Sequence, residues 1–152
     1  MVRLISACLL GIPCRYDGQS KGLSKQQLDI LRRKHTLIPI CPEIYGGLPT
    51  PRIPAEIVQG RVMTKDGVDV SQEYELGAEA SILIAEATGA HGAYLMARSP
   101  SCGVNEIYDG SFTGNLISGQ GVTSKKLADV GVDLFEVDPA MSLAELEILV
   151  ED

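Results

Sequence analysis

Four short apolar segments alternate with segments of helical periodicity, and this alternation constrains the fold more than any other feature of the chain. Segments this short and apolar are typical of strands buried on both faces of a parallel sheet. The pattern predicts a single α/β domain over residues 1–152: a three-layer, Rossmann-like open sheet of about four mainly parallel strands with helices on both faces. The expected strands are Val2–Ala7, Thr36–Ile40, Gly92–Ala97 and Val132–Val137.

The clearest helical pattern runs from Ser71 to Thr88. Ser71 is expected to cap this helix and Gly89 to end it. Apolar residues recur at spacings of three and four, which predicts one buried face. That face would consist of Leu76, Ala80, Leu83, Ile84 and Ala87. Ser24–Lys34 is predicted as a shorter helix with Ser24 as its cap, and Ser142 is expected to cap a last one, Leu143–Val150.

Smaller features complete the predicted fold. Lys65-Asp66-Gly67 is a turn signal between β-prone residues, which predicts a small hairpin insertion of Arg61–Thr64 and Val68–Val70. Pro39 lacks an N–H group and therefore favours an edge position for its strand. The Gly-, Ser- and Thr-rich segment that ends at Gly121 is expected to be a loop.

Composition limits the classes of partner. The chain has 13 Lys and Arg against 20 Asp and Glu, a net charge of −7, with no basic cluster. Binding to a nucleic-acid backbone is therefore not expected. The chain has no apolar run of about 18 residues and no recognisable signal peptide, so we expect a cytoplasmic protein without a membrane partner.

Three of the four cysteines directly follow expected strands: Cys8, Cys41 and Cys102. Because the carboxyl ends of parallel strands meet at one edge of an open sheet, their thiols are expected to lie close together there. A cytoplasmic chain of this size argues against a disulfide framework. The sequence therefore points to buried core thiols, to metal or cluster ligands, or to redox chemistry.

Three thiolates can hold a [4Fe–4S] cluster and leave one iron open. A zinc site with three thiolates and a water is the direct competitor, and core thiols are about equally compatible with the spacing. Cys14 lies six positions after Cys8. It could be a fourth ligand, a redox partner of Cys8 or a residue without a role at the site, and the last reading is favoured.

Several polar residues near the thiols are candidates for acid–base chemistry and substrate binding. Glu43 lies two residues after Cys41 and could act as a general base toward water, unless it is only an exposed charge. Ser99 and Ser101 could donate hydrogen bonds to substrate, or cap their own loop. The remaining candidates are Arg52, which could bind an anion, and Asp17 and Asp109, which occur in two Tyr-Asp-Gly turns.

These motifs together resemble the family known as domain of unknown function 523. The resemblance implies a thiouracil desulfidase with an oxygen-sensitive [4Fe–4S] cluster that works without net redox change. It also implies that Cys8, Cys41 and Cys102 are the cluster ligands, with Glu43 and Ser99 serving proton transfer and substrate positioning. The segments that carry it are 6–11, 15–18, Cys41-Pro42-Glu43, 46–52, 99–103 and 108–110.

One departure from the family pattern concerns the substrate. Met96 and Ala97 stand where a Lys-Glu pair is expected before the Cys102 loop. The expected function is therefore desulfuration of a thiouracil-like or another thiolated small molecule. The rival is a non-catalytic protein that binds zinc or a sulfur-containing metabolite. The oligomeric state, monomer or homodimer, stays open.

Overall fold

The computed structural model describes residues 1–151 and is built around a four-stranded sheet in the order β2-β1-β5-β8. All three pairs of neighbouring strands are parallel, which confirms the predicted open sheet. Pro39 lies in β2 at the edge of the sheet, as its missing N–H group predicted. The strands are β1 (Val2–Ser6), β2 (Thr36–Ile40), β5 (Gly92–Met96) and β8 (Asp133–Val137).

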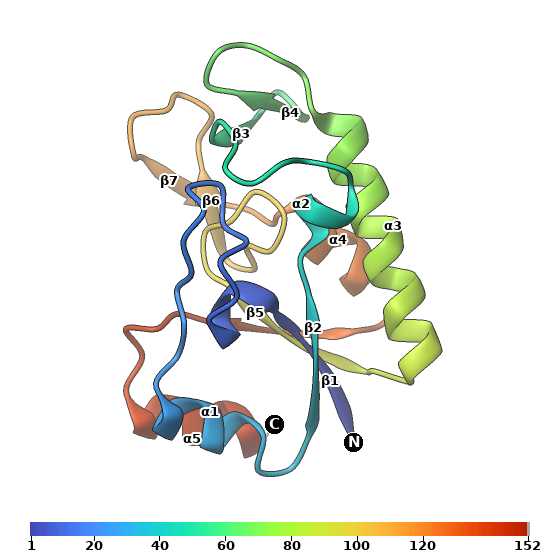
Figure 1. Cartoon of the computed structure of the whole chain (residues 1–152), viewed down its shortest axis with the longest axis vertical. Coiled ribbons are helices and arrows are strands. Elements are labelled where there is room, and N and C mark those ends of the chain that lie inside the picture. The colour runs from blue at the N-terminus through green and yellow to red at the C-terminus, as the bar shows by residue number, and fades with distance from the viewer. Residues whose placement is uncertain (152) are drawn as a thin grey trace.

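Two pairs of helices flank the sheet (Figure 1): α1 packs against α5, and α3 packs against α4. The chain passes from β1 to β2 in one direction and then returns across the sheet to β5 and β8. Right-handed crossovers therefore place the two helix pairs on opposite faces, and the predicted three layers are confirmed. The helices are α1 (Lys25–Leu31), α3 (Ser71–Thr88), α4 (Val122–Asp129) and α5 (Leu143–Glu151).

Two helix starts agree with the capping signals in the sequence. The Ser24 side chain accepts a hydrogen bond from the Gln27 amide, and the Gln27 side chain accepts one from the Ser24 amide. Ser142 and Glu145 form the same reciprocal pair at α5. α1 ends at Leu31, three residues before the predicted end.

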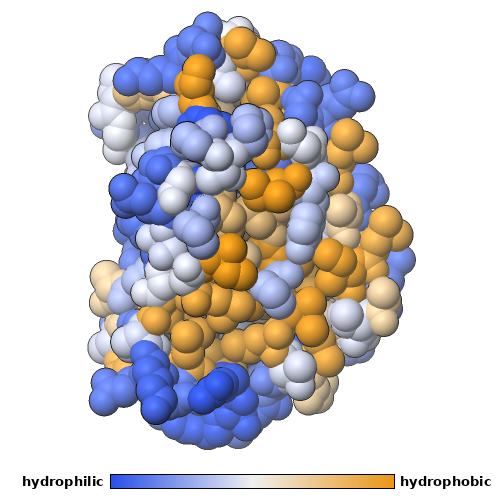
Figure 2. All heavy atoms as spheres, in the orientation of Figure 1, coloured by the Kyte–Doolittle hydropathy of each residue, from blue (hydrophilic) through white to orange (hydrophobic). Residues whose placement is uncertain are grey.

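The predicted buried face of α3 is wrong. Leu76 is 54% exposed and Leu83 is 65% exposed, and Figure 2 shows hydrophobic surface on the side where α3 lies. Ser71 is not the cap, because it is already helical and its hydroxyl accepts a hydrogen bond from the Val62 amide. Neighbouring backbone approaches α3 so closely that mostly small residues fit. The buried residues are Ser71, Tyr74, Gly77, Ala78, Ser81 and Ala85.

Two hairpins lie beyond the carboxyl ends of the strands (Figure 1). Arg61–Thr64 is a strand as predicted, β4, and it meets the predicted segment Val68–Val70 through an antiparallel bridge between Met63 and Asp69. Its longer partner, on the other side, is β3 (Ala55–Val58), which was not predicted. The Lys65–Gly67 turn does form, and it returns Val68 to hydrogen-bond with Thr64. A second hairpin, β6 (Glu106–Tyr108) with β7 (Leu116–Ser118), lies in the segment predicted to be a loop.

The core is centred on the sheet, where Leu4, Ile5, Tyr94 and Leu95 are fully buried. Within residues 1–151, no helix combines the length and the apolar character that crossing a membrane requires.

Candidate active site

The register of the sheet brings the first two cysteines together. Ser6 and Ile40 are paired at the last position of β1 and β2, so the chain leaves both strands at the same level. Cys8 then lies in a short 3-10 helix, η1 (Ala7–Leu10), and Cys41 immediately precedes α2 (Pro42–Tyr45). The loop after β5, the neighbour of β1 on its other side, supplies Cys102. The three thiols therefore meet where the direction of chain winding reverses, the usual place for a site in such sheets.

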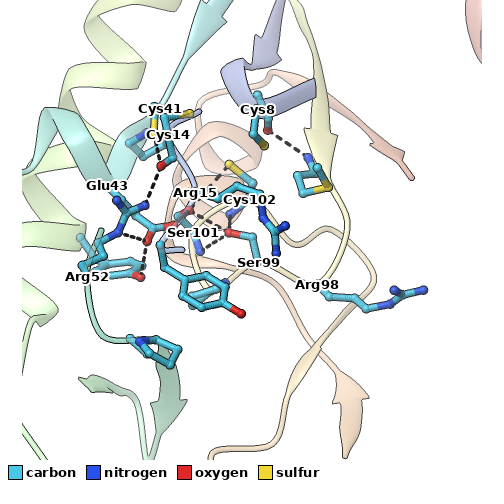
Figure 3. Close-up of a pocket in the computed structure, with 18 of the residues that line it drawn as sticks. Cys8, Cys14, Arg15, Cys41, Glu43, Arg52, Arg98, Ser99, Ser101 and Cys102 are labelled. Carbon is cyan, nitrogen blue, oxygen red and sulfur yellow. Dashed lines mark hydrogen bonds and ion pairs between the residues drawn. The ribbon is translucent and has the colours of Figure 1, made fainter. Parts of the chain in front are cut away.

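A cavity of about 410 Å³ opens at this position, and Cys8, Cys14, Cys41 and Cys102 all line it. Figure 3 shows the four labelled cysteines grouped together, with Glu43, Ser99 and Ser101 beside them. The predicted meeting of the three strand-end cysteines is thus present in the structure.

The loop that carries Cys102 is held by its own serine. The Ser99 hydroxyl accepts hydrogen bonds from the amides of Ser101 and Cys102, both at 3.1 Å. The Gly103 amide donates to the Ser99 carbonyl at 2.8 Å. Ser99 therefore acts as the cap of a tight turn, and its hydroxyl also contacts that of Ser101 at 2.9 Å.

The N-terminus of α4 holds the same loop from its other side. The amides of Thr123 and Ser124 donate to the Ser101 carbonyl, and the Ser124 hydroxyl donates to the Cys102 carbonyl at 2.8 Å. These amides have no partner within their own helix, so the loop satisfies them. Cys102 is consequently fixed by backbone contacts on both sides before any ligand binds.

Close contact with α3 fixes α2, which carries Glu43. A Cβ atom at Gly77 would lie 1.8 Å from the Pro42 carbonyl oxygen, and one at Gly46 would lie 1.9 Å from the Glu73 carbonyl oxygen. Glycine is therefore needed at both positions because the backbones of α2 and α3 lie so close together, and not because of an unusual φ angle. Cys41 and Glu43 are positioned directly against the long helix.

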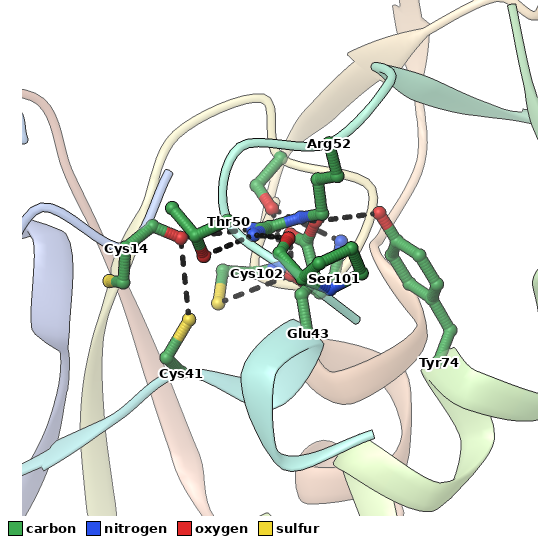
Figure 4. Close-up of polar contacts among 10 residues, drawn as sticks. Cys14, Cys41, Glu43, Thr50, Arg52, Tyr74, Ser101 and Cys102 are labelled. Carbon is green, nitrogen blue, oxygen red and sulfur yellow. Dashed lines mark hydrogen bonds and ion pairs between the residues drawn. The ribbon is translucent and has the colours of Figure 1, made fainter. Parts of the chain in front are cut away.

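Glu43 is held by three donors (Figure 4). The Tyr74 hydroxyl donates to its Oε1 at 2.8 Å, and Arg52 Nε donates to the same oxygen at 3.1 Å. The Ser101 hydroxyl donates to Oε2 at 3.0 Å. Since the Glu43 side chain is only 15% exposed, the alternative of an exposed loop charge is excluded, and the carboxylate is fixed within the site.

Arg52 connects the loops around the cavity through hydrogen bonds. Besides its ion pair with Glu43, its guanidinium donates to the carbonyls of Pro49 and Cys14 and to the Thr50 hydroxyl. The side chain is only 7% exposed. These donors are thus directed at protein acceptors, and substrate binding by Arg52 stays a prediction.

Cys14 is a direct neighbour of Cys41. The Cys41 thiol donates to the Cys14 carbonyl at 3.8 Å. The contact between the two thiols lowers the pKa of the Cys41 thiol and raises the pKa of the Cys14 thiol. Burial raises the pKa of Cys8 to about 11, with Cys41 adding to the effect, and burial raises that of Cys102 to about 12.

The donor set of the cavity fits an iron–sulfur cluster. Thiolates are the usual ligands of such clusters, and the cavity offers thiols from three separate loops. Among residues 1–151, no three His, Cys, Asp or Glu side chains converge on a position for a single metal ion. Binding would require the buried Cys8 and Cys102 thiols to release their protons.

The two aspartates predicted from the Tyr-Asp-Gly turns are not among the residues that line the cavity. Asp17 accepts a hydrogen bond from the Gln19 amide, and Asp109 accepts one from the Ser111 amide. Both carboxylates cap turns, which is the ordinary structural role of aspartate before glycine. Their role in substrate binding remains a prediction.

Sequence reasoning missed Tyr74 as well as Phe112, Lys21 and Lys65 at the mouth of the cavity. Tyr74 carries no local signal, because its contact with Glu43 depends on how α3 packs. Glu56 of β3 also lines the cavity, although nothing in its sequence context indicated a site. The mouth is aromatic and basic, in a chain of net charge −7. The residues concerned are Tyr16, Tyr108, Phe112, Arg15, Lys21, Lys65 and Arg98.

Comparisons with known proteins agree with this site. Residues 4–138 match the model of the 2-thiouracil desulfurase family. An uncharacterized protein of Bacillus subtilis (strain 168), YbbK, is 38% identical over 138 residues, which cover 84% of this chain and 90% of that protein. The solved structure of a [4Fe-4S]-dependent thiouracil desulfidase, TudS (DUF523Vcz), matches with a TM-score of 0.87 and 42% identity, covering 99% of this chain and 97% of that one. The chain, with its three strand-end cysteines around one cavity, belongs to the 2-thiouracil desulfurase family of enzymes.

Proposed function

We propose that this chain is a [4Fe–4S]-dependent desulfidase that converts the C=S group of a thiouracil-like substrate into C=O. The single observation that carries the proposal is the convergence of Cys8, Cys41 and Cys102 on one cavity beside the buried carboxylate of Glu43. Family membership and the likeness to a [4Fe-4S]-dependent thiouracil desulfidase support it.

The cluster, held by these three cysteines, would supply a soft Lewis-acidic iron suited to a thiocarbonyl sulfur. Cys14, the fourth thiol of the cavity, is left out of this ligand set, so that one iron stays open to substrate. The reaction needs no external electrons: C=S and H₂O give C=O and H₂S. The remaining steps are binding, orientation and proton movement, which the side chains of the cavity perform.

Glu43 is the group that would take a proton from the attacking water. Tyr74 and Arg52 donate to its Oε1. Among residues 1–151, Oε2 receives only the Ser101 hydroxyl, so it can accept a further hydrogen bond. Ser99 contacts Ser101, so a line of hydroxyls runs from the carboxylate along the Cys102 loop. In this arrangement Ser101 contacts Glu43 directly, and Ser99 acts through Ser101.

The basic side chains at the mouth of the cavity indicate which charge on the substrate is favoured. Four basic side chains line the cavity, but Arg15 forms an ion pair with Asp17 and Arg98 forms one with Asp138. Attraction of an anionic group therefore depends mainly on the other two, Lys21 and Lys65. We therefore expect a thiolated base that carries a phosphate to be used at least as well as the free base. This expectation is tested by comparing sulfide release from each thiolated base with that from its 5′-monophosphate.

Anaerobic iron–sulfur reconstitution tests the proposal. About four irons and four sulfides per chain are expected, followed by sulfide release from 2-thiouracil. Substitution of Cys41 by alanine should abolish both. A protein that binds zinc tightly and never accepts iron would overturn the proposal in favour of a zinc-binding protein, a rival that no observation on residues 1–151 favours.

A further inference from the structure

The loop that joins β6 to β7 contributes Phe112 and Gly114 to the lining of the cavity. Its hairpin lies beside the hairpin of β3 and β4 (Figure 1), and β6 contacts β3. The loop is closed at its base by a hydrogen bond from the Asp109 amide to the Asn115 carbonyl. Phe112, at the centre of the loop, lines the cavity. Its φ angle is +58°, a left-handed backbone conformation that residues other than glycine rarely adopt.

Glu56 of β3 holds this loop in place. Its Oε1 accepts hydrogen bonds from the Gly110 amide at 2.9 Å and from the Phe112 amide at 3.1 Å. The loop also touches β3 directly, since a Cβ atom at Gly110 would lie 2.7 Å from the Ile57 carbonyl oxygen. A strained backbone persists only where its surroundings impose it, and such residues gather at ligand clamps.

We propose that the ring of the substrate stacks on Phe112, and that Glu56 is the positioning residue that holds Phe112 for this contact. The inference rests on the proposed function. Cys102, Ser101 and Tyr74 are buried in the cavity, whereas Phe112 is half-buried on the loop of a hairpin. A planar ring on Phe112 can therefore direct its thiocarbonyl group toward the thiols. Aromatic side chains bind nucleobases in this way without requiring a particular hydrogen-bond pattern.

The competing explanation is that Phe112 only anchors the loop on β3 through apolar contact. Leucine would preserve such an anchor and remove the aromatic face, whereas tyrosine would preserve both. Phe112→Leu and Phe112→Tyr are therefore a matched pair that separates stacking from anchoring.

Uracil is the probe, because it has the ring of the substrate but no sulfur. Its dissociation constant is measured by calorimetry on the cluster-loaded protein. We expect Phe112→Leu to weaken binding by about 5- to 150-fold and Phe112→Tyr to leave it nearly unchanged. With 2-thiouracil, Phe112→Leu should raise KM and leave kcat within about twofold. Unchanged affinity in Phe112→Leu, equal losses in both variants, or no binding of uracil to the unsubstituted protein would overturn the proposal.

Glu56 is tested with a second pair. Glu56→Gln keeps an oxygen acceptor for the two amides, whereas Glu56→Ala removes it. We expect the alanine variant to weaken uracil binding and to speed hydrogen exchange at the Gly110 and Phe112 amides, and the glutamine variant to do neither. Faster hydrogen exchange in Glu56→Ala with unchanged uracil affinity would show that the Glu56 contacts hold the loop but do not serve substrate binding.

The desulfidase proposal and the stacking proposal can be refuted independently of each other. Phe112-dependent uracil binding without sulfide release would support stacking and refute the desulfidase. Normal sulfide release with unchanged uracil affinity in Phe112→Leu would support the desulfidase and refute stacking.

Discussion

The Tyr74 hydroxyl donates a 2.8 Å hydrogen bond to Oε1 of Glu43, across 31 positions of the sequence. Tyr74 lies in α3 and is only 2% exposed, while the other carboxylate oxygen is bound by Ser101 of the loop after β5. Burial and the nearby Glu43 charge raise the pKa of Tyr74, so its hydroxyl stays protonated and remains a donor. The orientation of the candidate base is thus determined by a helix that carries none of the thiols.

Replacing Tyr74 by phenylalanine tests this orientation. We expect kcat to fall about tenfold, because the loss of one hydrogen bond to a charged group is worth about 1.5 kcal/mol. Iron content should stay unchanged, since no cluster ligand is touched. The control is Tyr45→Phe, which removes an exposed hydroxyl that donates to the Pro39 carbonyl. If both variants keep the kcat of the unsubstituted protein, Tyr74 has no role in positioning Glu43.

The four cysteines should differ in what they contribute to the cluster. Serine at Cys8, Cys41 or Cys102 is expected to abolish iron binding, because the proposed cluster needs all three thiolates. Serine at Cys14 should leave about four irons per chain. Iron and sulfide are quantified after anaerobic reconstitution of each variant. Loss of the cluster in Cys14→Ser would instead identify a fourth ligand.

Gly77→Ala should disturb the site through the backbone. The added Cβ would lie 1.8 Å from the Pro42 carbonyl oxygen, so α2 must move away from α3. Overpacking of this kind costs about 1–3 kcal/mol, and the displacement of Cys41 and Glu43 should also lower the cluster content. Urea denaturation and iron analysis measure both effects. Gln72→Ala, an exposed change in the same helix, is the control and should alter neither quantity.

His35 should make the fold sensitive to acid. Burial and the nearby charge of Arg3 lower its pKa below the ordinary value of about 6.5. As the pH falls below 6.5, the unfolded chain takes up a proton that the folded protein resists, so stability decreases; above that pH the contribution is absent. Thermal unfolding at pH 7.5 and at pH 5.5 should show a smaller acid-induced loss for His35→Gln. An equal loss in both proteins would assign the acid sensitivity to other groups.

Local sequence signals were reliable where a contact is made within a few residues. The capping pair of Ser24 and Gln27 depends only on local geometry, and it is present. Pro39 predicted an edge strand because a missing N–H group cannot serve an interior ladder. Where packing decides, the signals failed: the spacing of Leu76 and Leu83 predicted a buried face, but close backbone contact with α2 selected the face that contains Gly77.

The open parallel sheet and the meeting of Cys8, Cys41 and Cys102 follow from the order of strands and helices along the chain. Strand alternation sets the topology, and all parallel strands end at the same edge of the sheet. The surroundings of the thiols depend instead on tertiary packing: the Tyr74 and Arg52 contacts to Glu43, the hydrogen bond of Cys41 to Cys14, and the hydrogen bonds of the Phe112 loop to Glu56. These contacts join residues far apart in the chain, and their distances depend on how helices and hairpins pack, which no local pattern encodes.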